Sequence, residues 1–209
     1  MKVVVFGANG KVGRLVVAEL LEHDHTIVAF AHSTPNFEAH PNLQIVQGDI
    51  YNADDVTRAI AGTDAVVSAL GSWGTSGKDV LTTAMQHIIP AMQASGMRRI
   101  ISLTGSDARA SGDSSGLVHW LSHLALSVLA GKVLRDGERH ITLLEQSDLD
   151  WSVVRSPVMN ESGDIKKYTF SSRRPLPWQT IHRHSVVKAL VSLLETDEFS
   201  KQAPFLVRI

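Results

Sequence analysis

The sequence contains no cysteine, which excludes disulfide bonds, thiolate metal sites and a cysteine nucleophile. Neither sign of charge predominates, because 20 lysines and arginines nearly balance 21 aspartates and glutamates to a net charge of −1. Such a balance carries no electrostatic signature of nucleic acid or of an anionic membrane. The N-terminus runs directly into a strand-like segment, without the charged and apolar regions of a signal peptide. We therefore expect a cytoplasmic protein with neither nucleic acid nor membrane as a partner.

A long uninterrupted apolar run is also missing. The most apolar stretch, residues 117–130, is interrupted by His119, Ser122, His123 and Ser127. It is too short and too polar to span a bilayer, and it predicts a well-buried helix. His119 and His123 stand four residues apart, as metal ligands on a helix can, but two ligands do not make a closed site. We expect no metal.

Short β-branched runs alternate with helical patterns along the 209 residues, a length that suits one domain spanning residues 1–209. The pattern predicts strands over residues 2–6, 26–30, 43–47, 65–69, 99–103, 151–155 and 204–208. It predicts helices over residues 11–22, 53–60, 79–95, 116–130, 131–147 and 185–195. Asp79 and Ser185 are the N-caps expected for the third and last helices. This alternation favours an α/β fold, a doubly wound and mostly parallel Rossmann sheet with helices on both faces.

The segment from Val158 to Thr180 is the least regular part of the chain. It contains Gly163, two prolines and the pair Arg173-Arg174. We expect it to form a small irregular flap on the substrate side, made of loops and one short strand, and not a separate domain.

Three glycines follow the first predicted strand in the stretch VFGANGKVGR, at Gly7, Gly10 and Gly13. A strand, a glycine-rich turn and a helix N-terminus together bind phosphate, because backbone amides and the helix dipole favour an anion there. Gly7 allows the tight turn, Gly10 lets the backbone approach a pyrophosphate, and Gly13 allows close packing of helix on strand. The pattern predicts a dinucleotide site; the alternative is a tight turn that binds nothing.

An NAD-specific site places an acidic residue about 20 residues after the glycine loop, on the adenosine ribose. Here residues 31–33 are Ala31, His32 and Ser33, so nothing repels a 2′-phosphate. Lys11 and His32 can attract one, although His32 is equally consistent with an exposed histidine without a role. The sequence therefore predicts NADP, with NADPH preferred over NADH.

Six stretches occur in the order seen in a known group of proteins: GANGKVGR, QGDIYNADDV, DAVVSALGSWG, RRIISLTGS, SDLDWSVVRSP and TIHRHSVVKALVSLLE. The chain resembles atypical short-chain dehydrogenase/reductases, and within them the NmrA-like and biliverdin-IXβ reductase (flavin reductase) group of NAD(P)H-binding proteins. The resemblance covers nearly the whole chain.

The resemblance implies a path for the cofactor. The residues along it are Gly7, Asn9, Gly10, Lys11, Val12 and Gly13 at the pyrophosphate, His32 at the 2′ position, Asp49 and Ile50 at the adenine, Leu70 and Gly71 at the inner ribose, and Thr104, Gly105, Pro157 and Val158 at the nicotinamide. Asp49 is also consistent with a turn residue, and Pro157 with a loop stop.

One departure from the short-chain dehydrogenases decides the chemistry that we expect. Their acid/base motif Tyr-x-x-x-Lys is missing, because Asp55 and Ser172 stand four residues after Tyr51 and Tyr168. Thr104 and Ser106 are then the candidate catalytic side chains. Such a site suits hydride transfer to a conjugated acceptor, such as a flavin, quinone or tetrapyrrole. The alternative is a non-catalytic NmrA-like redox sensor that binds a protein partner.

Three side chains are candidates for holding a planar substrate. Trp73 and Trp178 lie in loops expected at the carboxyl edge of the sheet, where either can stack on a ring or only cover the core. Arg155 leaves its strand toward the same edge, where it can orient a substrate or form an ion pair. We expect a monomer or a weak homodimer.

Overall fold

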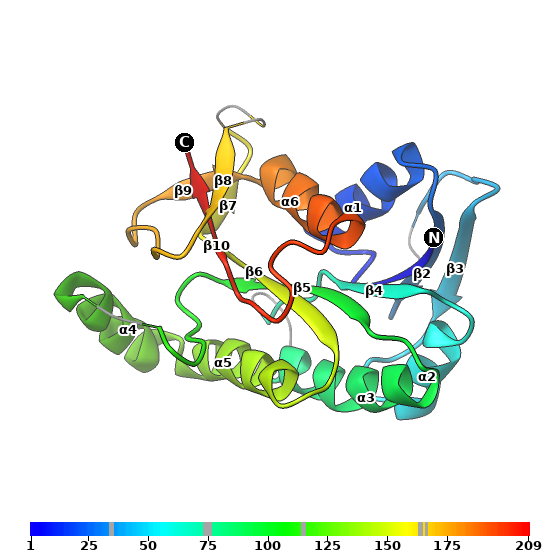
Figure 1. Cartoon of the computed structure of the whole chain (residues 1–209), viewed down its shortest axis with the longest axis horizontal. Helices are drawn as coiled ribbons and strands as arrows, with labels where there is room; N and C mark the ends of the chain where they lie inside the picture. Colours follow the sequence, from blue (N-terminus) through cyan, green and yellow to red (C-terminus); the bar gives the residue numbers. More distant parts are fainter. Residues whose placement is uncertain (34–35, 73–76, 114–115, 163–164, 166) are drawn as a thin grey trace.

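Eight strands form one sheet in the computed structural model, with helices on both of its faces (Figure 1). The structure describes residues 1–33, 36–72, 77–113, 116–162, 165 and 167–209. Across the sheet the strands are β3 (Leu43–Gln47), β2 (Thr26–Ala31), β1 (Lys2–Phe6), β4 (Ala65–Ser68), β5 (Arg99–Gly105), β6 (Asp150–Ser156), β10 (Phe205–Arg208) and β8 (Tyr168–Ser171). Neighbours run parallel except β10 and β8, which confirms the doubly wound, mostly parallel sheet.

The two faces of the central strands pack against different helix layers. In β1, Val3 and Val5 join the core shared with α1 (Lys11–Glu22) and α6 (Arg183–Glu195). Val4 and Phe6 join the opposite core, shared with α2 (Ala53–Ile60), α3 (Val80–Ala94) and α5 (Gly131–Glu145). All four side chains are fully buried. A strand covered on both faces needs no polar alternation, and this explains the continuous apolar runs in the sequence.

The start of α3 is capped from a distant part of the chain. Asp79 occupies the N-cap position, but its carboxylate accepts a hydrogen bond from the Tyr51 hydroxyl at 3.0 Å. The amides of Leu81 and Thr82 donate instead to the carboxylate of Asp136 in α5, at 3.0 and 2.8 Å. The predicted position of the cap is therefore right, but the side chain that binds the amides is another.

The helix α4 (Leu117–Leu129) lies at one end of the molecule, beyond the edge of the sheet (Figure 1). None of its residues is buried, so the prediction of a well-buried helix here is wrong. An apolar composition alone cannot distinguish a helix in a core from an apolar helix at the surface. Among the described residues no single helix is long and apolar enough to cross a membrane; α4 and α5 pass that test only as a pair, bent by 115°.

The irregular segment contains three short strands where one was expected. β7 (Val158–Asn160) and β9 (Thr180–His182) pair in parallel as a small second sheet, while β8 extends the main sheet. β9 leads directly into α6, whose N-cap is His182. Ser185 does not cap this helix, because its hydroxyl donates to the carbonyl of Ile165 at 2.7 Å.

Candidate active site

The three glycines shape the turn between β1 and α1. Gly7 has a φ of +76°, in the region that favours glycine, and its carbonyl accepts the amide of Gly10 at 2.9 Å. A Cβ at Gly13 would lie 2.1 Å from the Gly7 carbonyl oxygen, which confirms that Gly13 allows close packing of helix on strand. The N-terminus of α1, beginning at Lys11, thus faces the carboxyl end of β1. This is the geometry of a phosphate site.

A basic side chain that the sequence reasoning missed lies beside this turn. The Arg14 guanidinium donates from Nη2 to the side-chain oxygen of Asn9 and from Nε to its carbonyl at 3.2 Å. Asn9 in turn donates to the Ser33 hydroxyl at 2.9 Å, so Arg14, Asn9 and the end of β2 form one polar cluster. The neighbouring His32 is exposed. Because Arg14 follows Gly13 directly, the motif GKVGR contained the signal.

The two residues predicted at the adenine differ in their surroundings. Asp49 is partly exposed, and its carboxylate accepts the amide of Tyr51 at 3.0 Å, as a turn residue would. Ile50 is 9% exposed and packs in the core on the α2 and α3 side. Its carbonyl lies 2.8 Å from Nδ1 of His87. Their contact with the adenine stays a prediction.

A cavity of about 730 Å³ opens at the carboxyl ends of β4, β5 and β6. Its wall brings together the residues predicted for the ribose, the nicotinamide and catalysis: Leu70, Gly71, Thr104, Gly105, Ser106, Pro157 and Val158. Two helices close the opposite side. α5 contributes Val133, Leu134 and Gly137, and α4 contributes Ser122, Ala125 and Leu126. Hydrocarbon makes up most of this surface, so the cavity suits an apolar ligand.

The cavity holds few groups that can exchange a proton. Among the described residues of its wall, Asp107 is the only one with an ionisable side chain. Thr104 and Ser106 offer hydroxyls and are 8% and 9% exposed. A Cβ at Gly137 would lie 2.7 Å from the Thr104 hydroxyl, so α5 passes directly over this side chain. The wall can therefore position a ligand by hydrogen bonds and by its shape, but it has few groups for acid/base catalysis.

Neither tyrosine of the chain lines the cavity. Burial and the hydrogen bond to Asp79 raise the pKa of Tyr51 to about 12. Burial also raises the pKa of Tyr168, which lies on the edge strand β8. A phenol with a raised pKa is poorly matched to proton transfer near neutral pH. These positions agree with a site that does not use a tyrosine acid.

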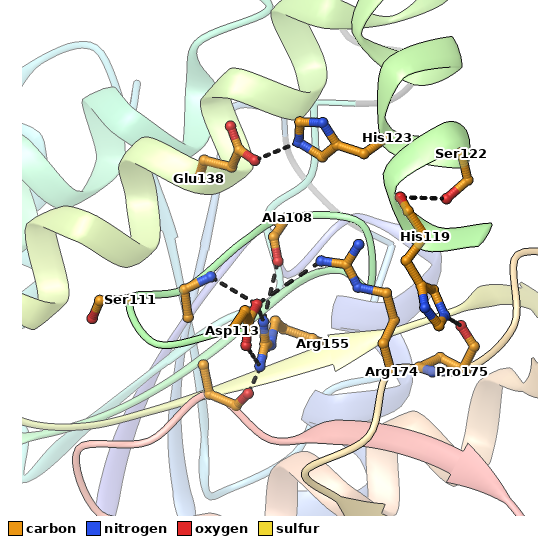
Figure 2. A network of polar contacts seen from close by, with 12 residues as sticks. Ala108, Ser111, Asp113, His119, Ser122, His123, Glu138, Arg155, Arg174 and Pro175 are labelled. Carbon is orange, nitrogen blue, oxygen red and sulfur yellow. Dashed lines mark hydrogen bonds and ion pairs between the residues drawn. The ribbon is translucent and has the colours of Figure 1, made fainter. Parts of the chain in front are cut away.

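Arg155 does not reach the cavity, so its predicted contact with substrate is corrected. Its side chain is almost fully buried, and its Nη2 donates to Asp113 at 3.0 Å while Nη1 donates to the other carboxylate oxygen (Figure 2). Its Nε donates to the carbonyl of Ala203 at 2.7 Å, and its guanidinium lies over the Phe205 ring, 3.6 Å from the centroid. A buried guanidinium needs a paired carboxylate, which explains why the ion-pair alternative holds.

The structure describes one of the two tryptophans predicted to stack on a substrate. Trp178 is 69% exposed and does not line the cavity, although Pro177 beside it does. Trp73 lies outside the described residues. A role for either in stacking on a substrate stays a prediction.

Two histidines attach α4 to the rest of the molecule (Figure 2). His123 Nε2 lies 2.8 Å from the carboxylate of Glu138 in α5, and His119 Nε2 lies 3.3 Å from the carbonyl of Pro175. From the same face of the helix, they thus contact two different segments of the chain. The inner side of α4 thereby stays against the cavity.

One group of three potential metal ligands occurs among the described residues. Ligand atoms of Glu161, His182 and His184 lie within 4.8 Å of one another. Arg183 pairs with Glu161, and the group sits at the N-terminus of α6, where the helix dipole disfavours a cation. We therefore assign no metal to it.

A family model described as NAD(P)H-binding matches residues 7–197. The chain belongs to this NAD(P)H-binding family. The match begins in the glycine loop and ends beyond α6, so it contains the turn, the cavity and the irregular segment.

Curated relatives match about a third to a half of the chain. A 3-beta-hydroxysteroid dehydrogenase of Mycolicibacterium neoaurum is 42% identical over 65 residues, which is 31% of this chain and 18% of that protein. A 2-alkyl-3-oxoalkanoate reductase of Stenotrophomonas maltophilia is 30% identical over 111 residues, 48% of this chain and 32% of the other. The matched region thus spans less than a third of the length of these relatives.

Solved structures show the same fold over the entire chain. The oxidoreductase ylbE from Lactococcus lactis has a TM-score of 0.82 at 17% identity, and the match covers 100% of this chain and 91% of the ylbE chain. ChuY from Escherichia coli O157:H7, described as an anaerobillin reductase, has a TM-score of 0.76 at 19% identity, covering 100% and 97%. A Veillonella parvula short-chain dehydrogenase/reductase in complex with NADP has a TM-score of 0.78 at 16% identity, covering 99% and 94%.

Proposed function

We propose that this chain is an NAD(P)H-dependent reductase that transfers hydride to a planar conjugated acceptor, such as a flavin, a quinone or a tetrapyrrole. The observation that carries the proposal is the apolar cavity of about 730 Å³, whose wall residue Leu70 lies against Gly7 of the glycine loop. Its wall has hydroxyls and hydrocarbon but a single ionisable side chain among the described residues, Asp107. The description of ChuY as a reductase supports the same reaction class.

The chemistry of the acceptor follows from this shortage of acids. Hydride added to a simple ketone leaves an alkoxide with a pKa far above 7, so an enzyme must provide a proton from a positioned acid. Hydride added to a flavin, quinone or tetrapyrrole leaves an anion delocalised over the ring system, which takes its proton from water. Such a reaction depends mainly on holding donor and acceptor together. Thr104 and Ser106 would then orient the two rings by hydrogen bonds.

We propose NADPH as the preferred cofactor. No acidic residue occupies positions 31–33 at the end of β2, where an NAD-specific site carries one. Arg14, with Lys11 three residues before it, supplies positive charge for a 2′-phosphate, and the exposed His32 at the end of β2 can add a hydrogen bond. Arg14 is held toward the end of β2 by its bonds to Asn9.

Steady-state oxidation of NADPH and NADH by the pure protein tests the reaction. The panel of acceptors is FMN, riboflavin, a short-chain quinone and biliverdin, with simple ketones and nucleotide sugars as the negative set. We expect turnover with at least one planar acceptor and none with the negative set. Tyr51→Phe and Tyr168→Phe should keep most of the activity. Turnover of a simple ketone that Tyr168→Phe abolishes would contradict the proposal.

A cavity-filling variant links the activity to this site. Gly105 lines the cavity, and a Cβ built there meets no atom within 4 Å, so Gly105→Leu should fold while filling the space for the rings. We expect its turnover to fall at least tenfold. Unchanged turnover in this variant would place the reaction elsewhere.

The second candidate function is a non-catalytic redox sensor of the NmrA-like kind. The observation that favours it is the same cavity wall, because Asp107 is the only described residue of that wall with an ionisable side chain. A sensor should bind NADP and NADPH with different affinities and consume neither. Cofactor binding without turnover of any acceptor would favour this function.

A further inference from the structure

Most of the exposed large apolar side chains among the described residues gather at one end of the molecule. Seven of them lie on α4, with exposed fractions from 47% to 83%: Leu117, Val118, Trp120, Leu121, Leu124, Val128 and Leu129. Leu176 and Trp178 add to them, at 38% and 69%. Both follow Pro175, whose carbonyl lies 3.3 Å from His119 of α4. Exposed apolar groups gathered in this way mark a surface that contacts something apolar.

The composition of α4 favours a lipid surface as the partner. The helix contains no aspartate, glutamate, lysine or arginine in its 13 residues. At 1.5 Å per residue it is about 20 Å long, shorter than the ~30 Å hydrocarbon layer, so it is suited to lie in the interface and not to cross it. Tryptophans such as Trp120 and Trp178 favour the boundary between lipid and water.

Positive charge lies directly after this apolar surface in the chain. Lys132, Arg135 and Arg139 are exposed on α5 and, with Lys78, line an open hollow of about 400 Å³. Of the two acids in that hollow, Asp136 is buried against the amides at the start of α3, and Asp79 accepts the Tyr51 hydroxyl. Exposed cations next to an apolar helix are complementary to anionic lipid headgroups. The net charge of −1 averages over the whole chain and hides this local excess.

We infer that α4 and residues 176–178 dock on an anionic bilayer surface, and that the acceptor is a lipid-dissolved quinone that enters the cavity from the bilayer. The inner residues of the same helix, Ser122, Ala125 and Leu126, line the cavity, so the contact surface and the cavity are two sides of one helix. The second part of this inference rests on the proposed function.

Cosedimentation with vesicles tests the docking surface. The vesicles contain phosphatidylcholine alone or with 30% phosphatidylglycerol, and the protein is the full chain without a tag. We expect binding to the anionic vesicles, weakened at least tenfold in Leu121→Ser/Leu124→Ser and in Lys132→Glu/Arg135→Glu, since each lost cation near the surface accounts for about fivefold. The matched control is Ile45→Ser, an exposed apolar residue of β3 (41% exposed), which should bind as the unmodified chain does.

The outcomes separate this inference from the proposed function. Oxidation of NADPH by a water-soluble short-chain quinone reports on the reaction, and oxidation by a long-chain quinone dissolved in the vesicles reports on delivery. We expect both, with only the second lost in Leu121→Ser/Leu124→Ser. Failure to bind the vesicles overturns the inference and leaves the proposed reductase activity intact. This holds whether light scattering shows a monomer or a dimer formed through α4. Failure of both quinones overturns the choice of acceptor, whatever the vesicles bind.

Discussion

The cofactor half of this molecule, residues 1–72 with the glycine loop, differs from the half that we propose to hold the acceptor, residues 99–182 (the acceptor half), in what creates the site. In the cofactor half, backbone geometry creates it: a positive φ at Gly7, a close approach at Gly13 and the start of α1. In the acceptor half, β5, β6, β7, α4 and α5 supply most of the cavity wall, which Leu70, Gly71 and Ser72 of the cofactor half complete. A backbone site is confined to a short motif, whereas a wall made of distant side chains appears only after folding. Variants in the two halves should therefore fail in different ways.

We expect the largest loss of stability at Gly13, where the backbone of α1 comes closest to the backbone of the glycine turn. Gly13→Ala places a Cβ 2.1 Å from the Gly7 carbonyl oxygen, so α1 must move away from β1. Alanine would gain about 1 kcal/mol in helix propensity, but the overlap should cost more. We expect a net loss of about 4 kcal/mol or more in the free energy of unfolding, measured by urea denaturation. Gly116→Ala, where a Cβ meets nothing within 4 Å, is the control and should be nearly neutral. A stable Gly13→Ala chain would contradict the packing.

In the acceptor half the largest effect should come from the ion pair under the cavity. Asp113→Ala leaves the buried Arg155 guanidinium without its carboxylate. Removing one partner of a buried pair costs about 3 kcal/mol or more in stability. We expect a lower urea midpoint and, at a temperature where the variant stays folded, an unchanged KM for the acceptor. If Asp113→Ala were as stable as the unmodified chain and had a raised KM for the acceptor, Arg155 would have to contact the substrate.

A buried histidine predicts a dependence of stability on pH. His140 in α5 is fully buried, its Nε2 lies 2.7 Å from the Ser102 hydroxyl, and burial lowers its pKa to about 4. The unfolded chain, with an ordinary histidine pKa of about 6.5, binds the proton first. The contribution of this neutral side chain is therefore complete above about pH 6.5 and is lost as pH falls toward 4, by about 3 kcal/mol in all.

Urea denaturation between pH 7.5 and pH 4.5 measures this effect. His140→Gln has no proton to gain, so the difference in unfolding free energy between the two proteins should shift with pH in this window. Parallel pH profiles for the two proteins would refute the assignment.

The glycine loop should lose binding without losing the fold. Gly10→Val puts a branched side chain where the backbone must approach the pyrophosphate, and we expect NADPH affinity to fall at least 100-fold, or about 2.7 kcal/mol. Gly116 is the matched control, because it also precedes a helix with nearly the same backbone angles (φ −73° at both; ψ 165° at Gly10 and 167° at Gly116). NADPH titration of Gly10→Val and Gly116→Val measures the affinity, and circular dichroism on the same samples checks the fold. Normal NADPH binding by Gly10→Val would reduce the loop to a structural turn.

The smallest effect concerns the choice between the two cofactors. Arg14→Ala should weaken NADPH binding about tenfold and leave NADH binding almost unchanged, because a charge-assisted contact at an exposed site is worth about 1.4 kcal/mol. His32→Asp should shift selectivity further toward NADH by repelling the 2′-phosphate. Equal losses for both cofactors in Arg14→Ala would show that it only supports Asn9 and the turn.

The contrast between the halves also explains what the sequence could predict. Periodicity predicts the bounds of the six helices of the described residues to within two residues, because the long helices repeat an apolar face. Strands of three residues, β7 and β9, are too short to show any alternation. The cap of α3 comes from Asp136, 55 residues after Leu81, and no local pattern encodes that contact.

The sequence indicates which residues belong near the site more readily than it indicates which groups they contact. Arg155 was expected to leave β6 toward the site, but the sequence could not decide between a substrate and Asp113, which lies 42 residues away. Arg14 was overlooked, although it directly follows the third glycine. The apolar run of α4 was read correctly as a helix, yet its exposure depends on where the sheet ends.

Single-turnover mixing tests the central claim most directly. The protein is loaded with NADPH without oxygen and mixed rapidly with FMN or a short-chain quinone, while the absorbance of the reduced nicotinamide is followed. We expect a first-order loss of one equivalent of NADPH, with a rate that saturates at high acceptor concentration and falls at least tenfold in Gly105→Leu. Bound NADPH that stays reduced with every planar acceptor would contradict it.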